Sequence, residues 1–284
     1  MEMECLAKGL LAGRRAWITG GGTGLGRAMA LRFAELGARI GLSGRREGPL
    51  VETLDAIRAN GGDGTVATCD VRDPEAVDAA LGRIVHDLGG LEILVNNAAG
   101  NFLCPSEELS PNGFAAVVNI VLNGTFHCTR AAGRHWIANG APGAVLSIAT
   151  TYAWTGSAFV LPSACAKAGV VAMTRSLAVE WGRHDIRLNA IAPGPIPTAE
   201  AFSRLLPTEK LAEDRKNRIP AGRFGTPEEL AELAAFMVSD AASWMRGEVV
   251  TLDGGEWLAG AGEFNELLEM PPAFWEHLKT MSGR

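Results

Sequence analysis

The stretch ITGGGTGLGRAMA, residues 18–30, joins a short apolar run to a segment whose apolar residues recur at helical spacing. Its glycines Gly20, Gly24 and Gly26 follow the spacing G-x-x-x-G-x-G, because residue 25 is Leu and residue 27 is Arg. Glycine permits a tight turn and lets backbone amides approach a phosphate at the positive end of the next helix. The stretch predicts a strand, a phosphate-binding turn and a helix, although a turn without ligand fits the spacing equally well.

The same alternation of short apolar runs and helical segments continues along the whole chain. The predicted strands are RAWIT (15–19), RIGLS (39–43), TVATC (65–69), EILVN (92–96), AVLSI (144–148), RLNAI (187–191) and EVVTL (248–252). Helical spacing is clear in residues 26–37 and 74–89. Strands that alternate with helices imply parallel pairing with right-handed crossovers. We therefore expect an α/β fold: a Rossmann-type, doubly wound parallel sheet of about seven strands with helices on both faces, and ligands at the strands' carboxyl ends.

Length and composition favour one domain. The 284 residues can bury one sizeable core, and no linker rich in Pro, Gly or Ser divides them. We expect a single dinucleotide-binding domain over residues 1–284 with a C-terminal extension from about residue 256. The aromatic residues of this extension leave two alternatives open, docking on a partner subunit or covering a substrate pocket.

Charge and cysteine usage exclude several functional classes. The net charge of −6, without a dense Lys/Arg cluster, argues against a nucleic-acid binder. Five cysteines without a C-x-x-C pair and five histidines without ligand spacing predict neither a metal nor a disulfide frame. No apolar run reaches the roughly 18–20 residues of a membrane helix. Glu2 and Glu4 are unlike a transit peptide, and the final SGR is unlike a peroxisomal address, so we expect a cytoplasmic enzyme. A mitochondrial form whose leader was removed is the alternative.

The second predicted strand ends in SGRR, residues 43–46. An enzyme that prefers NAD usually has Asp or Glu here to bind the ribose 2′-hydroxyl. This chain has Gly44 followed by Arg45 and Arg46, and the planar fork of an arginine suits a 2′-phosphate. The pattern favours NADPH, with Arg45 at the 2′-phosphate; a solvated arginine pair at a helix start is the alternative.

Six separated motifs together resemble the short-chain dehydrogenase/reductase family, in order over nearly the whole chain. They are TGGGTGLG (19–26), CDV (69–71), NNAAG (96–100), Lys167, PGPI (193–196) and DGG (253–255). The resemblance implies a dinucleotide site in which the glycine turn binds phosphates, CDV the adenine, NNAAG the length of the cofactor and PGPI the nicotinamide. The residues implied are Gly20, Thr23, Gly24, Leu25, Gly26, Asp70, Val71, Asn97, Ala98, Gly100, Pro193, Gly194 and Ile196.

The expected active site departs from the family pattern. The family's Asn, Ser, Tyr and Lys set corresponds here to Val121, Thr150, Ser163 and Lys167, so only the lysine is retained. Reduction of a ketone needs an acid that protonates oxygen, a role that a tyrosine phenol fills and a serine hydroxyl fills poorly. The chain's only tyrosine, Tyr152, lies eleven residues before Ser163.

One branch of the family shares this pattern: NNAAGNF (96–102), SACAKAG (163–169), PGPI and AFSR (201–204) resemble the 2,4-dienoyl-CoA reductases. Such an enzyme adds hydride at the far end of a conjugated diene, and protonation at C2 gives a 3-enoyl-CoA. Hydrogen-bond donors to the thioester carbonyl would then replace the phenol acid. The resemblance implies Tyr152 and Asn101 as these donors, Lys167 at the nicotinamide ribose and Ser163 as an accessory group.

Coenzyme A carries phosphates, so cations are expected near the pocket rim. The resemblance points to Arg72 and Arg204 as substrate-binding residues, together with Phe102. Alternatively, Arg72 pairs with a nearby carboxylate such as Asp73, Tyr152 is a packing aromatic, and Asn101 is a turn residue bonded to its own backbone.

The resemblance further implies a homotetramer built on helices of the VLNGTF (121–126) and SACAKAGVVAM (163–173) regions, acting on an acyl-CoA in unsaturated fatty acid β-oxidation. Three rival functions stay open. Two are enzymes, a trans-2-enoyl-CoA reductase and a ketone reductase. The third is a non-catalytic NADPH-binding sensor or scaffold, against which the retained Lys167 and both donors count.

Overall fold

The computed structural model describes residues 6–198 and 208–282. Seven parallel strands form one sheet in the order β3-β2-β1-β4-β5-β6-β7. They are β1 (Arg15–Thr19), β2 (Arg39–Gly44), β3 (Gly64–Thr68), β4 (Ile93–Asn96), β5 (Gly143–Ile148), β6 (Ile186–Pro193) and β7 (Val249–Leu252). Each lies within two residues of a predicted strand. The predicted α/β class and doubly wound sheet are confirmed.

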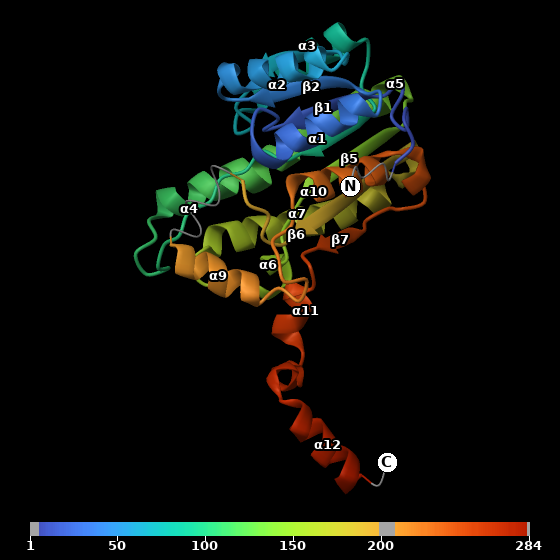
Figure 1. Ribbon diagram of the computed structural model, residues 1–284. Coiled ribbons are helices and arrows are strands. Elements are labelled where there is room, and N and C mark those ends of the chain that lie inside the picture. Colours follow the sequence, from blue (N-terminus) through green and yellow to red (C-terminus); the bar gives the residue numbers. More distant parts are fainter. Residues whose placement is uncertain (1–5, 199–207, 283–284) are drawn as a thin grey trace.

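Helices cover both faces of the sheet (Figure 1). On one face α1 (Gly24–Glu35), α2 (Glu47–Ala59) and α10 (Pro227–Val238) enclose a core cluster with strand residues. On the other face α3 (Pro74–Leu88), α5 (Gly124–Asn139) and α7 (Leu161–Glu180) enclose a second. The strands are therefore buried from both sides, which explains why they read as continuous apolar runs rather than as alternating ones.

The two buried tryptophans of this core have hydrogen-bond partners for their indole N–H groups. Trp17 and Trp136 are fully buried. The indole nitrogen of Trp17 donates to Ser43 Oγ, and that of Trp136 donates to the Leu91 carbonyl at 2.7 Å. Because a buried donor without a partner is costly, these bonds let large aromatic residues fill the space between sheet and helices.

Helix ends follow signals that are visible in the sequence. Asp73 caps α3 by accepting from the amides of Glu75 and Ala76, and Gly89 ends it in the left-handed conformation. Thr226 and Glu229 form a capping box at the start of α10. The shorter elements are α4 (Pro111–Val118), the π-helical η1 (Asn119–Asn123), α6 (Tyr152–Thr155), η2 (Gly182–His184), α9 (Glu209–Asn217) and η3 (Asp240–Ala242).

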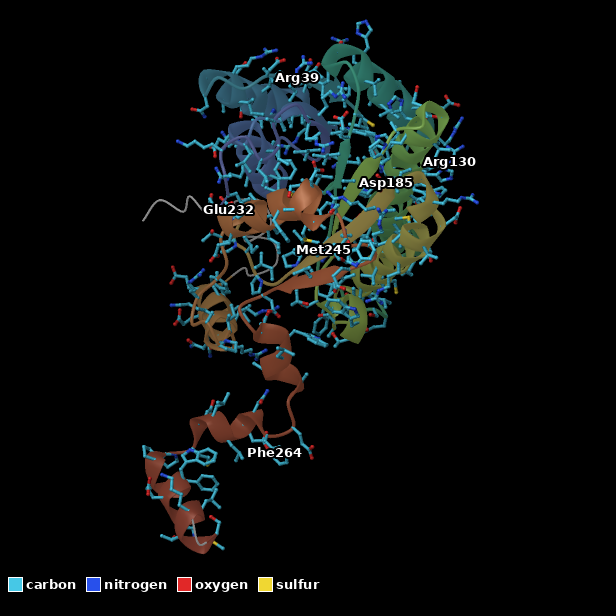
Figure 2. All side chains as sticks on the ribbon, turned by 90° about the vertical axis from the view of Figure 1, so that its right-hand side faces the viewer. Arg39, Arg130, Asp185, Glu232, Met245 and Phe264 are labelled. Atoms are coloured by element: carbon cyan, nitrogen blue, oxygen red, sulfur yellow. The ribbon has the colours of Figure 1, made fainter. Side chains whose placement is uncertain are left out.

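Residues 256–282, called here the C-terminal arm, leave the body beyond β7. The arm comprises α11 (Glu256–Ala261), η4 (Asn265–Glu269) and α12 (Pro272–Met281), and it projects away from the sheet in both Figure 1 and Figure 2. Its root is fixed, because the Asp253 carboxylate accepts from the amides of Gly255 at 2.9 Å and Trp257 at 2.8 Å. The Trp257 ring also packs on Trp154 of α6, with ring centroids 5.6 Å apart.

The order of the strands fixes where a ligand can bind. The chain runs outward from β1 to β3 and then returns to place β4 on the other side of β1. At this reversal the loops after neighbouring strands diverge and leave a crevice at the carboxyl ends. Across residues 6–198 and 208–282, no helix combines the length and apolar content of a membrane span.

Candidate active site

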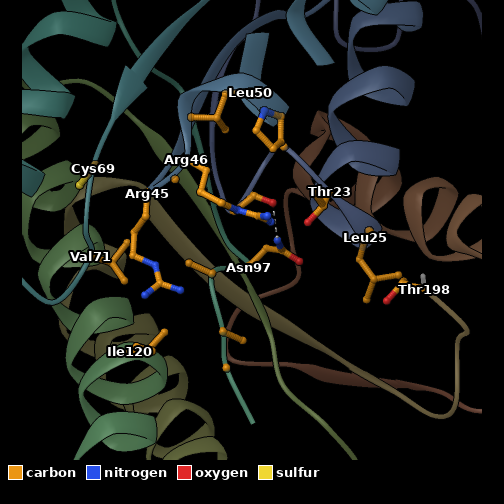
Figure 3. A pocket seen from close by; sticks show the side chains of 18 of the residues that line it. Thr23, Leu25, Arg45, Arg46, Leu50, Cys69, Val71, Asn97, Ile120 and Thr198 are labelled. Atoms are coloured by element: carbon orange, nitrogen blue, oxygen red, sulfur yellow. Dashed lines mark hydrogen bonds between the residues drawn. The ribbon is translucent and has the colours of Figure 1, made fainter. Parts of the chain in front are cut away.

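A cavity of about 540 Å³ lies at the carboxyl ends of β1 to β4 (Figure 3). Its wall includes eleven residues of the predicted cofactor site and the predicted donor Asn101. The cofactor residues are Gly20, Thr23, Gly24, Leu25, Arg45, Asp70, Val71, Asn97, Ala98, Gly100 and Ile196. Segments that are up to 178 residues apart in the sequence thus meet around one space.

The glycine turn between β1 and α1 is shaped by contacts with the turn after β4. Thr19 Oγ1 accepts from the amides of Asn97 at 3.0 Å and Ala98 at 3.1 Å. The Asn97 side chain donates back to the carbonyls of Thr19 at 3.0 Å and Gly20 at 3.2 Å. A Cβ on Gly26 would lie 2.2 Å from the Gly20 carbonyl oxygen, so any larger residue would force the cradle to shift. The cradle leaves room for a pyrophosphate beside the α1 N-terminus.

Arg45 and Arg46 extend from the end of β2 into the same space (Figure 3). Asp70, which lines the same cavity, is held by Arg72, whose guanidinium bonds to both carboxylate oxygens at 2.5–3.0 Å. These bonds lower the pKa of Asp70, and Arg45 adds a smaller attraction. An ionised Asp70 beside Arg45 makes this rim polar, whereas the adjacent Val71 supplies an apolar surface for a base.

Several lining residues lie outside the predicted set. They are Gly22, Gly44, Arg46, Pro49, Leu50, Cys69, Ala99, Ile120 and Thr198. Most flank predicted residues and could have been found by extending each motif by one position. Ile120 is different, because it belongs to the π-helical η1, and a π-helical turn often marks a functional site. The sequence itself shows no signal for that turn.

The PGPI motif is placed only in part on this cavity. Ile196 lines it, whereas Pro193 lies at the end of β6 and Gly194 lines a smaller neighbouring cavity that Ile196 also borders. A Cβ on Gly194 would lie 2.6 Å from Asp253 Cβ. Gly194 is therefore needed because Asp253, the first residue of the DGG motif, packs directly against it. The motif therefore connects the nicotinamide end of the predicted site to the root of the C-terminal arm.

Tyr152, Ser163 and Lys167 come together at the carboxyl end of β5. The Tyr152 hydroxyl lies 3.0 Å from Ser163 Oγ. Ser163 is buried in α7, and Lys167 follows one turn later and donates to the Ile148 carbonyl at the last residue of β5. The tyrosine thus reaches, from α6, the helix position at which the family's acid would stand.

Lys167 is buried in α7. Val121 of η1 packs with Ala166 and Val170 of α7, which flank the lysine in sequence. Burial lowers the pKa of Lys167 from 10.5 to about 8. At neutral pH the side chain is still mostly an ammonium, because pH 7 lies below this value.

Asn101 follows the turn after β4 and forms a turn of its own. Its Oδ1 accepts from the amide of Phe102 at 2.9 Å, as the structural alternative predicted. Within the part of the chain that the structure describes, no partner is found for the Asn101 side-chain nitrogen. This bond confirms the turn interpretation and uses only the side-chain oxygen, so the donor role of the Asn101 N–H groups stays a prediction.

The predicted substrate-binding residues have different outcomes. Phe102 is partly exposed next to Asn101, with its ring against the start of α4. Arg72 is paired with a nearby carboxylate, as the alternative interpretation had it, but the partner is Asp70 and not Asp73, which caps α3. Arg204 lies outside the described residues. The roles assigned to these three residues and to the catalytic set stay predictions.

The geometry defines what the site can do chemically. The cavity is suited to a dinucleotide for three reasons. Its glycines let the backbone come close to a phosphate, the Arg45 guanidinium can bind another phosphate, and its volume suits a large ligand. Next to it stand one phenol, one amide with open donors and one buried ammonium, all suited to stabilising negative charge on an oxygen. In residues 6–198 and 208–282 no group of His, Cys, Asp and Glu side chains could hold a metal ion.

Comparison with known proteins gives consistent matches over most of the chain. A family model described as Enoyl-(Acyl carrier protein) reductase matches residues 20–256. The chain is 50% identical over 242 residues to a Bacillus subtilis (strain 168) protein named "Probable 2,4-dienoyl-CoA reductase", with the qualifier (2E)-enoyl-CoA-producing. That alignment covers 85% of this chain and 95% of the other.

Two further matches extend the comparison. A Caenorhabditis elegans protein named "Probable 2,4-dienoyl-CoA reductase 3", with the qualifier (3E)-enoyl-CoA-producing, is 44% identical over 255 residues, or 88% of this chain and 82% of that one. Among solved structures, a gluconate 5-dehydrogenase from Burkholderia cenocepacia J2315 in complex with NADP and tartrate is similar with a TM-score of 0.82. It is 32% identical and covers 87% of this chain and 96% of its own.

Proposed function

The chain belongs to the short-chain dehydrogenase/reductase family, and on that premise we propose that it is an NADPH-dependent 2,4-dienoyl-CoA reductase that forms a 3-enoyl-CoA. One observation carries the proposal. The hydroxyl of Tyr152 bonds to Ser163, the residue in the family's acid position, one turn from Lys167. A phenol is thus present at the site, but it arrives from α6 and not from the position that serves ketone reduction.

The cofactor assignment rests on the residues of the cavity. When bound, NADPH supplies a hydride to C5 of the conjugated diene. The glycine cradle binds its pyrophosphate through backbone amides, and Arg45 binds the 2′-phosphate through its planar fork. Lys167 donates to the nicotinamide ribose while its backbone contact at Ile148 keeps the ammonium in place.

Two donors stabilise the charge that reaches the thioester. Tyr152 donates through its hydroxyl and Asn101 through its side-chain N–H, and one such donor contributes about 3–4 kcal/mol in the transition state. The positive charge of Lys167 favours the same electron-rich state. Ser163 holds the Tyr152 hydroxyl in its orientation, since the two oxygens lie 3.0 Å apart.

The site of protonation decides the product. A proton at C2 leaves the double bond between C3 and C4, whereas a proton at C4 leaves it between C2 and C3. The printed names of the two relatives differ on this point, (2E) for the Bacillus protein and (3E) for the Caenorhabditis protein. In this assignment Tyr152 and Asn101 hold the negative charge on the thioester oxygen, next to C2 and three bonds from C4, and water supplies the proton there; this supports the 3-enoyl product. NMR of the isolated product distinguishes the two positions.

The proposed reaction is tested by NADPH oxidation with 2,4-hexadienoyl-CoA. We expect rapid turnover, and much slower turnover with a 2-enoyl-CoA or with a ketone. Faster reduction of the 2-enoyl-CoA would instead support an enoyl-CoA reductase. Tight NADPH binding without turnover of any of the three would indicate a binding protein.

The role of Asn101 can be isolated with a matched pair of variants. Asn101→Asp keeps an oxygen that accepts from the Phe102 amide and so keeps the turn, but it removes the N–H donors. Asn101→Ala removes both. We expect each variant to lose about 100-fold or more in kcat. Full activity in Asn101→Asp would show that Asn101 serves only the turn.

The proposal includes a homotetramer assembled through the outer faces of α5 and α7. These faces carry exposed apolar side chains, among them Phe126, Ile137 and Val179, the last 85% exposed. Such side chains on neighbouring helices are typical of a buried interface. Light scattering of the native protein should give four times the mass of the chain, and Val179→Glu should reduce it. A monomeric native protein would contradict this part of the proposal.

A further inference from the structure

Phe159, in the loop between α6 and α7, has a backbone conformation that is unfavourable for its side chain. Its φ is +65°, and among the described non-glycine residues only Asp185 shares a positive φ. A bulky residue rarely adopts this left-handed region, because its Cβ approaches the following carbonyl. Burial does not explain the conformation, since the residue is 57% exposed. A specific contact must therefore hold the backbone of Phe159.

The contact is a hydrogen bond to a different loop. The carbonyl of Phe159 accepts from the amide of Cys104 at 2.9 Å. Cys104 lies three residues after Asn101, in the segment that follows β4, whereas Phe159 lies between Tyr152 and Ser163. The two loops come from adjacent strands, β4 and β5, but are otherwise separate in sequence. The bond therefore joins the segment that carries one predicted donor to the segment that carries the other.

The loop between α6 and α7, which contains Phe159, is also closed at its base. The Tyr152 hydroxyl and Ser163 Oγ lie 3.0 Å apart and bring the two ends of the loop together. Val160, directly after Phe159, is buried, and its carbonyl accepts from the Ala164 amide at 3.0 Å as α7 begins. Because the loop is fixed at its base and where it enters α7, a movement of Cys104 would also move Tyr152. A shift of either loop would change the separation of the two donors.

We propose that Phe159 is a positioning residue: its left-handed backbone directs its carbonyl to Cys104 and so fixes the Asn101 loop relative to Tyr152. For its catalytic consequence this inference rests on the dienoyl-CoA reduction proposed above. Both donors must reach one thioester oxygen, and misplacement by an ångström can cost on the order of 100-fold in rate. The backbone of Phe159, and not its ring, is the part that matters.

Substitutions at residue 159 separate backbone from ring. Phe159→Gly and Phe159→Asn both remove the ring but tolerate a positive φ, whereas Phe159→Val removes the ring and disfavours that region strongly. We expect Phe159→Val to lower kcat on a dienoyl-CoA by on the order of 10- to 100-fold, with NADPH affinity unchanged as the control for folding. Phe159→Gly and Phe159→Asn should keep kcat within about threefold, because each can still direct its carbonyl to Cys104. Equal loss in all three variants, or no loss in Phe159→Val, would overturn the proposal.

The donor side of the bond offers a second matched pair. Cys104→Ala keeps the backbone N–H, whereas Cys104→Pro removes it. We expect Cys104→Ala to behave like the parent protein and Cys104→Pro to resemble Phe159→Val. Combining Cys104→Pro with Phe159→Gly should restore nothing, since the bond lacks its donor. An active Cys104→Pro variant would contradict the inference.

A measurement without substrate keeps the inference separate from the proposed reaction. Hydrogen exchange of a peptide that covers residues 101–106 reports the Cys104 amide directly. Protection should be retained in Phe159→Gly and lost in Phe159→Val, whether or not the protein reduces a dienoyl-CoA. Equal exchange in the two variants would refute the backbone link. A parent protein that does not oxidise NADPH with a dienoyl-CoA would refute the proposed reaction and leave the exchange result to decide the link.

Discussion

The cofactor half and the substrate half of the site are built in different ways. The proposed cofactor half depends on one strand-turn-helix unit, in which Gly20 and Gly24 line the cavity and Gly26 packs against the Gly20 carbonyl. The substrate half depends on side chains from separate loops, Asn101 after β4 and Tyr152 after β5. A site that binds through backbone groups tolerates little change in residue type. In a site that binds through side chains, the donor can instead come from a different loop. Here Tyr152 stands on α6 and Ser163 on α7, where the family's acid would stand.

The largest effect should come from the substrate half. Tyr152→Phe removes the hydroxyl that bonds to Ser163 and that is proposed to donate to the thioester. We expect kcat on a dienoyl-CoA to fall by about 100-fold or more. NADPH affinity, measured by fluorescence titration, should change little because Tyr152 does not line the cofactor cavity. A parallel loss of NADPH affinity would break the separation of the two halves.

A change in the cofactor half should instead lower cofactor affinity and leave kcat nearly unchanged. Arg45→Ala should weaken NADPH more than NADH, because only NADPH carries the 2′-phosphate. A charge-assisted bond contributes about 1.5–3 kcal/mol, which corresponds to roughly 10- to 150-fold in affinity. At saturating cofactor, kcat should stay near the parent value. Equal affinities for both cofactors in the parent protein would contradict the assignment of Arg45.

The glycine cradle allows a test of the backbone itself. Gly26→Ala places a Cβ against the Gly20 carbonyl and the Asn97 amide, and should lower the free energy of unfolding by about 1–3 kcal/mol. Gly48→Ala is the matched control, since a Cβ there meets nothing within 4 Å in α2. The control should be neutral or more stable by up to about 1 kcal/mol. Urea unfolding of both variants measures the difference, and similar values would mean that the cradle can relax.

Lys167 is proposed to serve both halves and gives the smallest expected effect. Burial lowers its pKa to about 8, so the ammonium is present below that pH and is lost as the pH rises through it. We expect kcat/KM to fall above about pH 8, by up to tenfold per pH unit. Lys167→Arg keeps the charge over this range and should flatten the alkaline limb while lowering the rate. An alkaline limb that persists in Lys167→Arg would belong to another group.

Sequence reasoning succeeded best for the fold and the cofactor half. The β1 and α3 boundaries match their predicted residues closely, because Pro74 and Gly89 are local signals for a helix start and end. It was less complete for contacts between loops. For the alternative role of Arg72 in an ion pair it named Asp73 as an example, but Asp73 caps α3 and Asp70 makes the ion pair. It also gave no indication of the π-helical turn that brings Ile120 to the cavity.

The sequence by itself determined the alternation of strands and helices, the glycine turn, the arginines after β2 and the exchange of the family's acid for Ser163. Each of these is encoded by neighbouring residues, so it can be read without knowing the rest of the chain. Only the tertiary structure decided that Tyr152 bonds to Ser163, that Asn101 directs its oxygen to its own backbone, and that Phe159 adopts a left-handed conformation to reach Cys104. These features depend on the adjacency of β4 and β5, which places side by side two loops separated by about fifty residues, and no local pattern records that contact.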